Sequence, residues 1–117
     1  MVEPETTQTI QFDDFLKVNI NCGTVIRIED FPQARKPSYK IWIDFGQNIG
    51  TKQTSAQITH LYQKDSLVGK QILAVTNFPP KKIAGFKSEV LLLGLDGPGG
   101  VVVLQPERQV ENGKRVY

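Results

Sequence analysis

The fold is decided by residues 18–28, which read Val-Asn-Ile-Asn-Cys-Gly-Thr-Val-Ile-Arg-Ile. Apolar side chains occupy most even-numbered positions of this stretch, whereas Asn19, Asn21 and Arg27 stand at odd-numbered ones. Successive side chains of a β-strand point to opposite faces, so this alternation predicts a strand with one buried face. Gly23 interrupts the stretch, and a glycine inside a strand commonly marks a bulge or a sharp bend. We therefore expect a bent first strand.

Five further segments have the composition of strands and are separated by turn residues. They are residues 40–45, 51–56, 70–75, 89–93 and 101–105. Short helices are predicted at residues 12–17 and 57–62. Residues 94–100 end in Asp96-Gly97-Pro98-Gly99-Gly100, and such a run is predicted to form a loop that does not continue a strand.

This order of elements predicts an all-β fold. Many short strands with few helices in a chain of 117 residues indicate one small barrel or sandwich. The bent first strand and a helix between the third and fourth strands favour the OB-fold, a five-stranded barrel, here with short helices and extra C-terminal strands. We expect an N-terminal arm at residues 1–11 and one domain at residues 12–117.

Positive charge is concentrated in the middle of the chain. Residues 31–88 hold nine bases and only two acids, Asp44 and Asp65, a net charge of +7 in a chain whose total is +2. The bases are Arg35, Lys36, Lys40, Lys52, Lys64, Lys70, Lys81, Lys82 and Lys87. Cations gathered on one surface attract an anionic partner. The alternative at this point is a solvated surface that lysines keep soluble.

The composition argues against a membrane protein or a secreted one. No uninterrupted apolar run exceeds four residues, so we expect no membrane insertion. The N-terminus carries acids and no basic segment, unlike a secretory signal. One cysteine, Cys22, excludes an internal disulfide and favours a cytoplasmic location.

Residues suited to catalysis are few. His60 is the one histidine, so neither a zinc site nor a histidine-assisted nucleophile has recognisable spacing. We expect His60 to be an exposed helical residue and Cys22 a small buried apolar one. Asp44-Phe45-Gly46 is better interpreted as a strand that ends in a turn than as a kinase magnesium motif. We therefore expect a protein that is not an enzyme and needs no cofactor or metal.

The most informative segment is residues 77–88, Asn-Phe-Pro-Pro-Lys-Lys-Ile-Ala-Gly-Phe-Lys-Ser. Pro79 and Pro80 favour an extended backbone, after which Lys81, Lys82 and Lys87 follow without an acid. These features predict a rigid cationic loop. Phe78 and Phe86 are candidates for stacking on bases, and Asn77 and Ser88 for hydrogen bonds to phosphate, sugar or base edges. Alternatively, either phenylalanine anchors the loop to the barrel, and we favour this for Phe86.

A second polar segment spans residues 52–59. Along a strand, Lys52, Thr54 and Ala56 share one face, and Gln53, Ser55 and Gln57 share the other. One interpretation is a row that faces a ligand. The other is a solvent-exposed face that ends in a helix-capping Thr54 or Ser55.

Residues 52–59 and 77–91, with Phe31-Pro32 and Asp44-Phe45-Gly46, closely resemble the export-related chaperone CsaA family, a stand-alone form of the tRNA-binding domain. The resemblance implies an OB-fold homodimer that binds tRNA or unfolded secretory polypeptides without catalysis. It also implies that positions of the family's ligand surface are occupied here by Lys52, Ser55, Gln57, Asn77, Lys81, Lys82, Gly85 and Ser88. Our candidate site adds Phe78, Pro79, Phe86 and Lys87.

We expect a non-catalytic chaperone whose basic OB-fold surface binds unfolded or precursor polypeptides and also tRNA, with the export machinery as a further partner. The alternative is a dedicated tRNA-binding module that assists tRNA structure or aminoacylation, and an enzyme is the least favoured hypothesis. An apolar strand at residues 101–104 and a helix carrying Phe12, Phe15 and Leu16 are candidates for a symmetric dimer interface.

Overall fold

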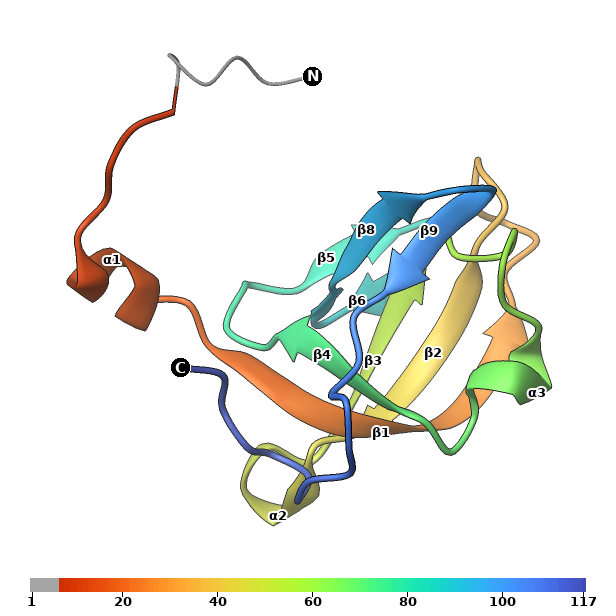
Figure 1. Ribbon diagram of the computed structural model, residues 1–117. Coiled ribbons are helices and arrows are strands. Elements are labelled where there is room, and N and C mark those ends of the chain that lie inside the picture. The colour runs from red at the N-terminus through yellow and green to blue at the C-terminus, as the bar shows by residue number, and fades with distance from the viewer. Residues whose placement is uncertain (1–6) are drawn as a thin grey trace.

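The computed structural model describes residues 7–117, and its centre is a five-stranded antiparallel sheet that curls into a nearly closed barrel (Figure 1). The strand order is β3-β2-β1-β4-β7. Their bounds are β1 Ile20–Asp30, β2 Tyr39–Asp44, β3 Thr51–Ala56, β4 Gln71–Val75 and β7 Leu91–Leu92. This is the OB-fold, as the sequence predicts.

The first strand is shared between two neighbours, which is how the sheet curls. Residues 20–24 of β1 pair with β4, and residues 24–30 pair with β2. The register shifts between Val25 and Arg27, two residues beyond the expected position at Gly23. The predicted pattern of burial is wrong in this strand, because Val25 is buried and Ile26 is 49% exposed. Before the bulge the odd-numbered Gly23 and Val25 face the core, and the inserted residue then places the even-numbered Ile28 against it.

The barrel closes where β3 meets the segment before β7. The Glu89 amide donates to the Gln53 carbonyl at 2.8 Å. The Thr54 hydroxyl donates to the Val90 carbonyl at 2.7 Å. Thr54 is 1% exposed, and these bonds satisfy polar groups that would be costly to bury unpaired.

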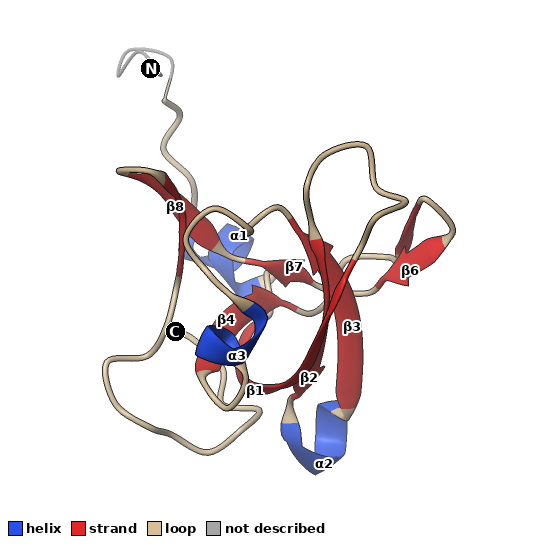
Figure 2. Cartoon of the chain, turned by 90° about the vertical axis from the view of Figure 1, so that its right-hand side faces the viewer, coloured by secondary structure: helices blue, strands red, loops and turns tan. Residues whose placement is uncertain are grey.

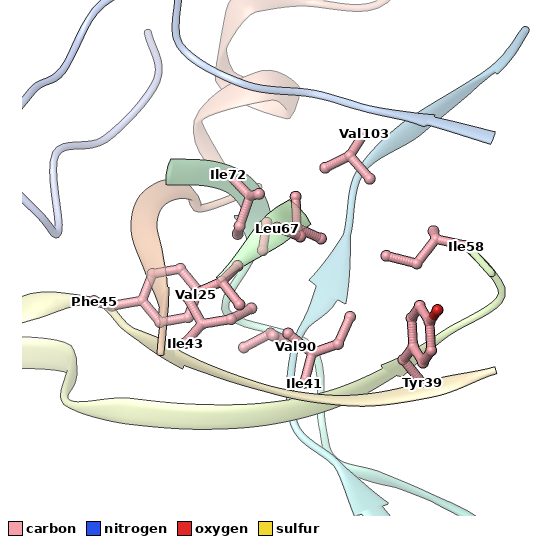
Figure 3. Packing of buried hydrophobic residues seen from close by; sticks show 11 residues of the cluster. Val25, Tyr39, Ile41, Ile43, Phe45, Ile58, Leu67, Ile72, Val90 and Val103 are labelled. Atoms are coloured by element: carbon pink, nitrogen blue, oxygen red, sulfur yellow. The ribbon is translucent and has the colours of Figure 1, made fainter. Parts of the chain in front are cut away.

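The core fills the barrel with branched and aromatic side chains that point toward one another (Figure 3). Its largest fully buried members are Phe45, Ile41, Ile43, Leu67, Ile72 and Val25. Val103 comes from the C-terminal hairpin and covers one end of this cluster (Figure 3). The Val103 amide donates to the Tyr62 hydroxyl at 2.9 Å. This bond ties the hairpin to the barrel.

Within residues 7–117, three short helices flank the sheet: α1 Phe12–Leu16, α2 Gly46–Ile49 and α3 Lys64–Leu67. The prediction of α1 is confirmed, and α2 was expected only as a turn. The helix predicted at residues 57–62 is wrong, because these residues form coil and a turn and the helix begins at Lys64. A hydrogen bond from the Gln63 amide to the Ser66 hydroxyl caps that later start. His60 is exposed, as expected, but lies in the turn.

Two hairpins stand outside the barrel sheet. The first joins β5 Lys81–Ile83 to β6 Phe86–Ser88, and the second joins β8 Gly94–Gly97 to β9 Gly100–Val103. Figure 2 shows β6 and β8 on opposite sides of the molecule. Loops were predicted at residues 77–88 and 94–100, and both predictions are wrong because each range contains strands. Residues with positive φ at the two turns, including Ala84 and Gly85 in one and Gly99 in the other, let the chain reverse within two residues.

The N-terminal arm is described only in part. Residues 7–11 form an exposed coil before α1, and residues 1–6 of the expected arm lie outside the described residues. At the other end of the chain, Arg115 donates to the Leu16 carbonyl at 2.6 Å and thereby holds the tail against the end of α1.

Candidate nucleic-acid and polypeptide interface

The β5–β6 hairpin gives each lysine of the predicted loop a defined face. Lys82 pairs with Lys87 across the hairpin, and Ile83 pairs with Phe86. Directly paired residues share a face and neighbouring positions alternate. Because Phe86 packs toward the barrel, Lys82 and Lys87 point away from it. Both lysines are exposed.

Phe86 anchors the hairpin to the outside of the barrel. Its ring centroid lies 5.5 Å from that of Phe31 and 5.8 Å from that of Trp42, in edge-to-face geometry. The Lys40 ammonium lies 4.9 Å from the Phe31 ring and 5.1 Å from the Phe86 ring. Edge-to-face pairs and cation–π contacts of this kind stabilise packing. The favoured anchoring interpretation of Phe86 agrees with these contacts, although the anchor is a small aromatic cluster and not the barrel interior.

Gln53 is a positioning residue that the sequence analysis did not single out. The Trp42 indole donates to the Gln53 side-chain oxygen at 3.2 Å, and the Gln53 amide group donates to the Lys87 carbonyl at 2.8 Å. The Ser88 and Thr54 hydroxyls lie 3.0 Å apart and share a hydrogen bond. These bonds hold β6 against β3. In the sequence, the only feature that could have indicated this role for Gln53 was the alternation of polar residues along 52–57.

An apolar groove lies between the β5–β6 hairpin, the loop after β4, β3 and the start of β7. Its lining residues are Thr54, Ser55, Phe78, Pro79, Pro80, Lys81, Ile83, Ser88, Glu89, Val90 and Leu91. The volume of about 520 Å³ falls in the range of ligand sites. Phe78 is 53% exposed and Leu91 is 49% exposed. Large apolar side chains therefore remain uncovered in the groove, beside hydroxyl groups that offer hydrogen bonds.

The structure brings many of the candidate site residues together but separates three of them. Ser55, Phe78, Pro79, Lys81 and Ser88 line the apolar groove, and Gly85 forms the hairpin turn with φ of 80°. Lys82, Phe86 and Lys87 belong to the same hairpin but do not line the groove. Lys52 lies opposite Ile43 at the start of β3, Gln57 lines a different cleft, and Asn77, directly before Phe78, is bonded to Lys17 outside the groove.

Asn77 has a structural contact that its sequence context did not reveal. Its amide group donates to the Lys17 carbonyl at 2.7 Å, and its side-chain oxygen accepts from the Asn19 amide at 2.9 Å. Both ends of the side chain thus hold the loop after β4 against the junction of α1 and β1. Asn77 positions the start of the groove.

Most central cations have no acidic partner among the residues that the structure describes. Of the nine bases in residues 31–88, only Lys64 forms an ion pair with a carboxylate within residues 7–117, to Asp30 at 2.8 Å. That hydrogen bond raises the Lys64 pKa. The lysines of the hairpin are exposed to solvent, whereas the Lys40 ammonium lies over the Phe31 and Phe86 rings. The surface of the hairpin is consequently suited to an anion.

Two features of the described residues bear on metal binding and on thiol chemistry. No group of three histidine, cysteine or acidic side chains comes together there in a way that suits a metal ion. Cys22 is 2% exposed, as predicted, and burial raises the pKa of its thiol. A buried thiol with a raised pKa is a poor nucleophile.

Among the described residues, no helix combines the length and the apolar character needed to cross a membrane.

The barrel, the outward lysines and the apolar groove define a ligand-binding domain of the OB-fold class. Residues 20–115 match the putative tRNA binding domain family. The chain belongs to this family and, within it, to the CsaA proteins.

Two solved structures support the assignment to the CsaA proteins. The chaperone CsaA of Bacillus anthracis is 49% identical, with a TM-score of 0.87, and the match covers 94% of this chain and 100% of that one. The CsaA chaperone protein of Picrophilus torridus is 48% identical, with a TM-score of 0.89, covering 93% of this chain and 100% of that one. These likenesses extend through the whole described fold.

Larger curated relatives share the domain only. The methionine–tRNA ligase of Porphyromonas gingivalis is 36% identical over 110 residues, which are 93% of this chain and 16% of that protein. The chain spans about 14 to 16% of the length of the methionine–tRNA ligases that it matches.

Proposed function

We propose that this protein binds tRNA without catalysis, through the outward face of the β5–β6 hairpin. The observation that carries the proposal is the pairing of Lys82 with Lys87 on a face turned away from the barrel, without an acidic partner in residues 7–117. A match to the putative tRNA binding domain family supports the choice of nucleic acid. The proposal places the protein in the cytoplasm, where tRNA is found.

Recognition by this face depends on the phosphate backbone more than on base sequence. Lysine is a compact point charge that contacts phosphates, and such contacts position RNA without reading its bases. Trp42 is not free for base stacking, because the Arg27 guanidinium lies 4.9 Å from its ring and Phe86 packs on it as well. We therefore expect binding of many tRNAs with similar affinity.

The double variant Lys82→Ala/Lys87→Ala tests this assignment. Log affinity falls as log salt rises, and each lost phosphate contact should make this dependence shallower by about 0.7 to 1 in slope. Titration of labelled tRNA across a salt series measures both the slope and the affinity. The matched control is Lys70→Ala/Lys114→Ala, which removes the same charge from the α3–β4 loop and the C-terminal tail. Equal slopes for both double variants would show that Lys82 and Lys87 do not contact the RNA.

A second function is proposed for the apolar groove, namely binding of unfolded or precursor polypeptides. The specific observation is the exposure of Phe78 and Leu91 beside Pro79 and Pro80. Apolar side chains of an extended polypeptide gain free energy when they leave water for such a groove. The similar CsaA proteins of Bacillus anthracis and Picrophilus torridus are named chaperones, which supports this role. Handing precursors to the export machinery belongs to the same proposal.

Salt dependence separates the two ligands. Apolar burial persists at high salt, whereas phosphate contacts weaken. Binding of a reduced, unfolded polypeptide should therefore survive high salt and be retained by Lys82→Ala/Lys87→Ala. A polypeptide affinity that declines with salt as steeply as tRNA affinity does would contradict a separate role for the groove.

We propose further that the protein is a homodimer. On the β8–β9 hairpin, Leu95 pairs with Val102, and these residues are 63% and 38% exposed. Phe12 and Leu16 of α1 are 67% and 43% exposed. Exposed apolar patches mark association surfaces, and Figure 2 shows β8 far from β6. An interface on β8–β9 would thus leave the β5–β6 hairpin free for ligands.

Leu95→Asp is expected to shift the protein toward the monomer, because a carboxylate in an apolar interface is costly to desolvate. Sedimentation equilibrium over a range of concentrations measures the mass of parent and variant. Asp96→Ala, at the neighbouring strand position, serves as the control. A parent protein that sediments as a monomer at every concentration would refute the dimer.

A further inference from the structure

A basic cleft lies on the other side of the β5–β6 hairpin from the apolar groove. Its lining residues are Ala34, Arg35, Lys36, Ser38, Gln57, Ile83 and Ala84. Three separate parts of the chain meet here: the β1–β2 loop, the residue after β3, and the tip of the hairpin. Ile83 lines both hollows, so the hairpin is the wall between them. Arg35 and Lys36 are two of the nine central bases.

The loop that carries these two cations is held in place. Phe31 at its start is 4% exposed and packs against the Phe86 ring. The Ala34 amide donates to the Phe31 carbonyl at 3.2 Å, and the Ser38 hydroxyl donates to the Lys36 carbonyl at 2.9 Å. Pro37 further restricts the backbone of Lys36. The two charged side chains therefore project from a fixed base.

The electrostatics of the cleft favour an anion. Arg35 and Lys36 are exposed, and neither forms an ion pair within residues 7–117. Gln57 adds a side-chain amide that can donate a hydrogen bond, and no carboxylate of residues 7–117 lines the cleft. Arginine matches phosphate oxygens with paired N–H donors, and its charge is permanent.

We propose that the basic cleft binds phosphodiester groups of an RNA whose chain crosses the tip of the β5–β6 hairpin. Lys82 and Lys87 contact the backbone on one side of Ala84 and Gly85, and Arg35 and Lys36 contact it on the other. The small tip residues let the backbone pass closely. This inference rests on the proposed tRNA binding and adds a second contact region to it. The polypeptide groove is separate and is not part of this path.

The variant Arg35→Ala/Lys36→Ala should lower tRNA affinity on the order of tenfold at low salt and reduce the salt slope by about 1.5 to 2. Lys70→Ala/Lys114→Ala again controls for net charge. The intrinsic fluorescence of Trp42, the one tryptophan, and the thermal midpoint confirm that each variant is folded. Unchanged affinity and slope for Arg35→Ala/Lys36→Ala, with a clear loss for Lys82→Ala/Lys87→Ala, would overturn the cleft and leave the proposed function standing. A parent protein that does not bind tRNA would overturn both.

Crosslinking distinguishes direct contact from a distant effect of charge. Cys22 is buried, so a Ser38→Cys variant labels with a thiol-reactive azide chiefly at the cleft, and Lys70→Cys provides the control position. We expect photocrosslinks to tRNA from position 38 and few from position 70. Equal yields from the two positions, or crosslinks from position 38 to an unfolded polypeptide in place of tRNA, would overturn the assignment.

Discussion

Gly23→Ala is expected to destabilise the fold by about 2 kcal/mol or more, which corresponds to a fall in Tm of about 8 °C or more for a domain of this size. A Cβ atom at this position would lie 2.6 Å from the Ile43 Cγ2 and 2.7 Å from a ring carbon of Phe45. Ile43 and Phe45 are fully buried in the barrel, so neither can move away cheaply. The clash should exceed the gain of about 0.5 to 1 kcal/mol that alanine normally brings to a strand.

Urea denaturation followed by Trp42 fluorescence measures this loss. The contrast is Gly69→Ala, where a Cβ meets nothing within 4 Å and the only cost comes from a φ of 87°. A double variant with Ile43→Ala should be more stable than the sum of the two single changes predicts, because the smaller side chain makes room for the new methyl group. A Gly23→Ala protein as stable as the parent would show that the core accommodates the methyl group.

Phe86→Ala should release the β5–β6 hairpin and weaken binding of both proposed ligands. The ring supplies the contacts with Phe31 and Trp42, and the hairpin carries the lysines and one wall of the groove. A released hairpin must be ordered again when a ligand binds, at about 1 to 2 kcal/mol for each residue fixed. Ordering two residues alone corresponds to a loss of about 30-fold or more in affinity.

Trp42 reports this release directly, because it packs against Phe86 and should become more exposed to water. The expected results are a red shift of its fluorescence and a joint loss of tRNA and polypeptide affinity. Phe86→Leu is the matched control, since it retains apolar volume at the same position. Loss of tRNA affinity without any change in Trp42 fluorescence would instead assign Phe86 a direct contact with the ligand.

Several elements were predictable because their determinants are local. The strand segments follow from residue composition and flanking turn residues, and a bent first strand with a helix between the third and fourth strands predicted the OB-fold. The alternation in residues 18–28 predicted a strand there but not which side chains face inward. The prediction of a helix at residues 57–62 was wrong because tertiary contacts fix this segment. Ile58 is buried in the core, and Tyr62 forms hydrogen bonds with the Tyr39 hydroxyl and the Val103 amide. The β5–β6 hairpin was missed because the left-handed turn at Ala84 is unusual for a residue with a side chain.

The candidate site shows the same division. The sequence by itself determined which residues are cationic, which are apolar and where prolines stiffen the chain, because these are properties of single residues and near neighbours. Only the tertiary structure decided that Phe86 reaches Phe31 and Trp42, that Asn77 is held by Lys17 and Asn19, and that Arg35 and Lys36 share a cleft with the hairpin tip. Those contacts join segments dozens of residues apart, and barrel closure, not local preference, brings them together.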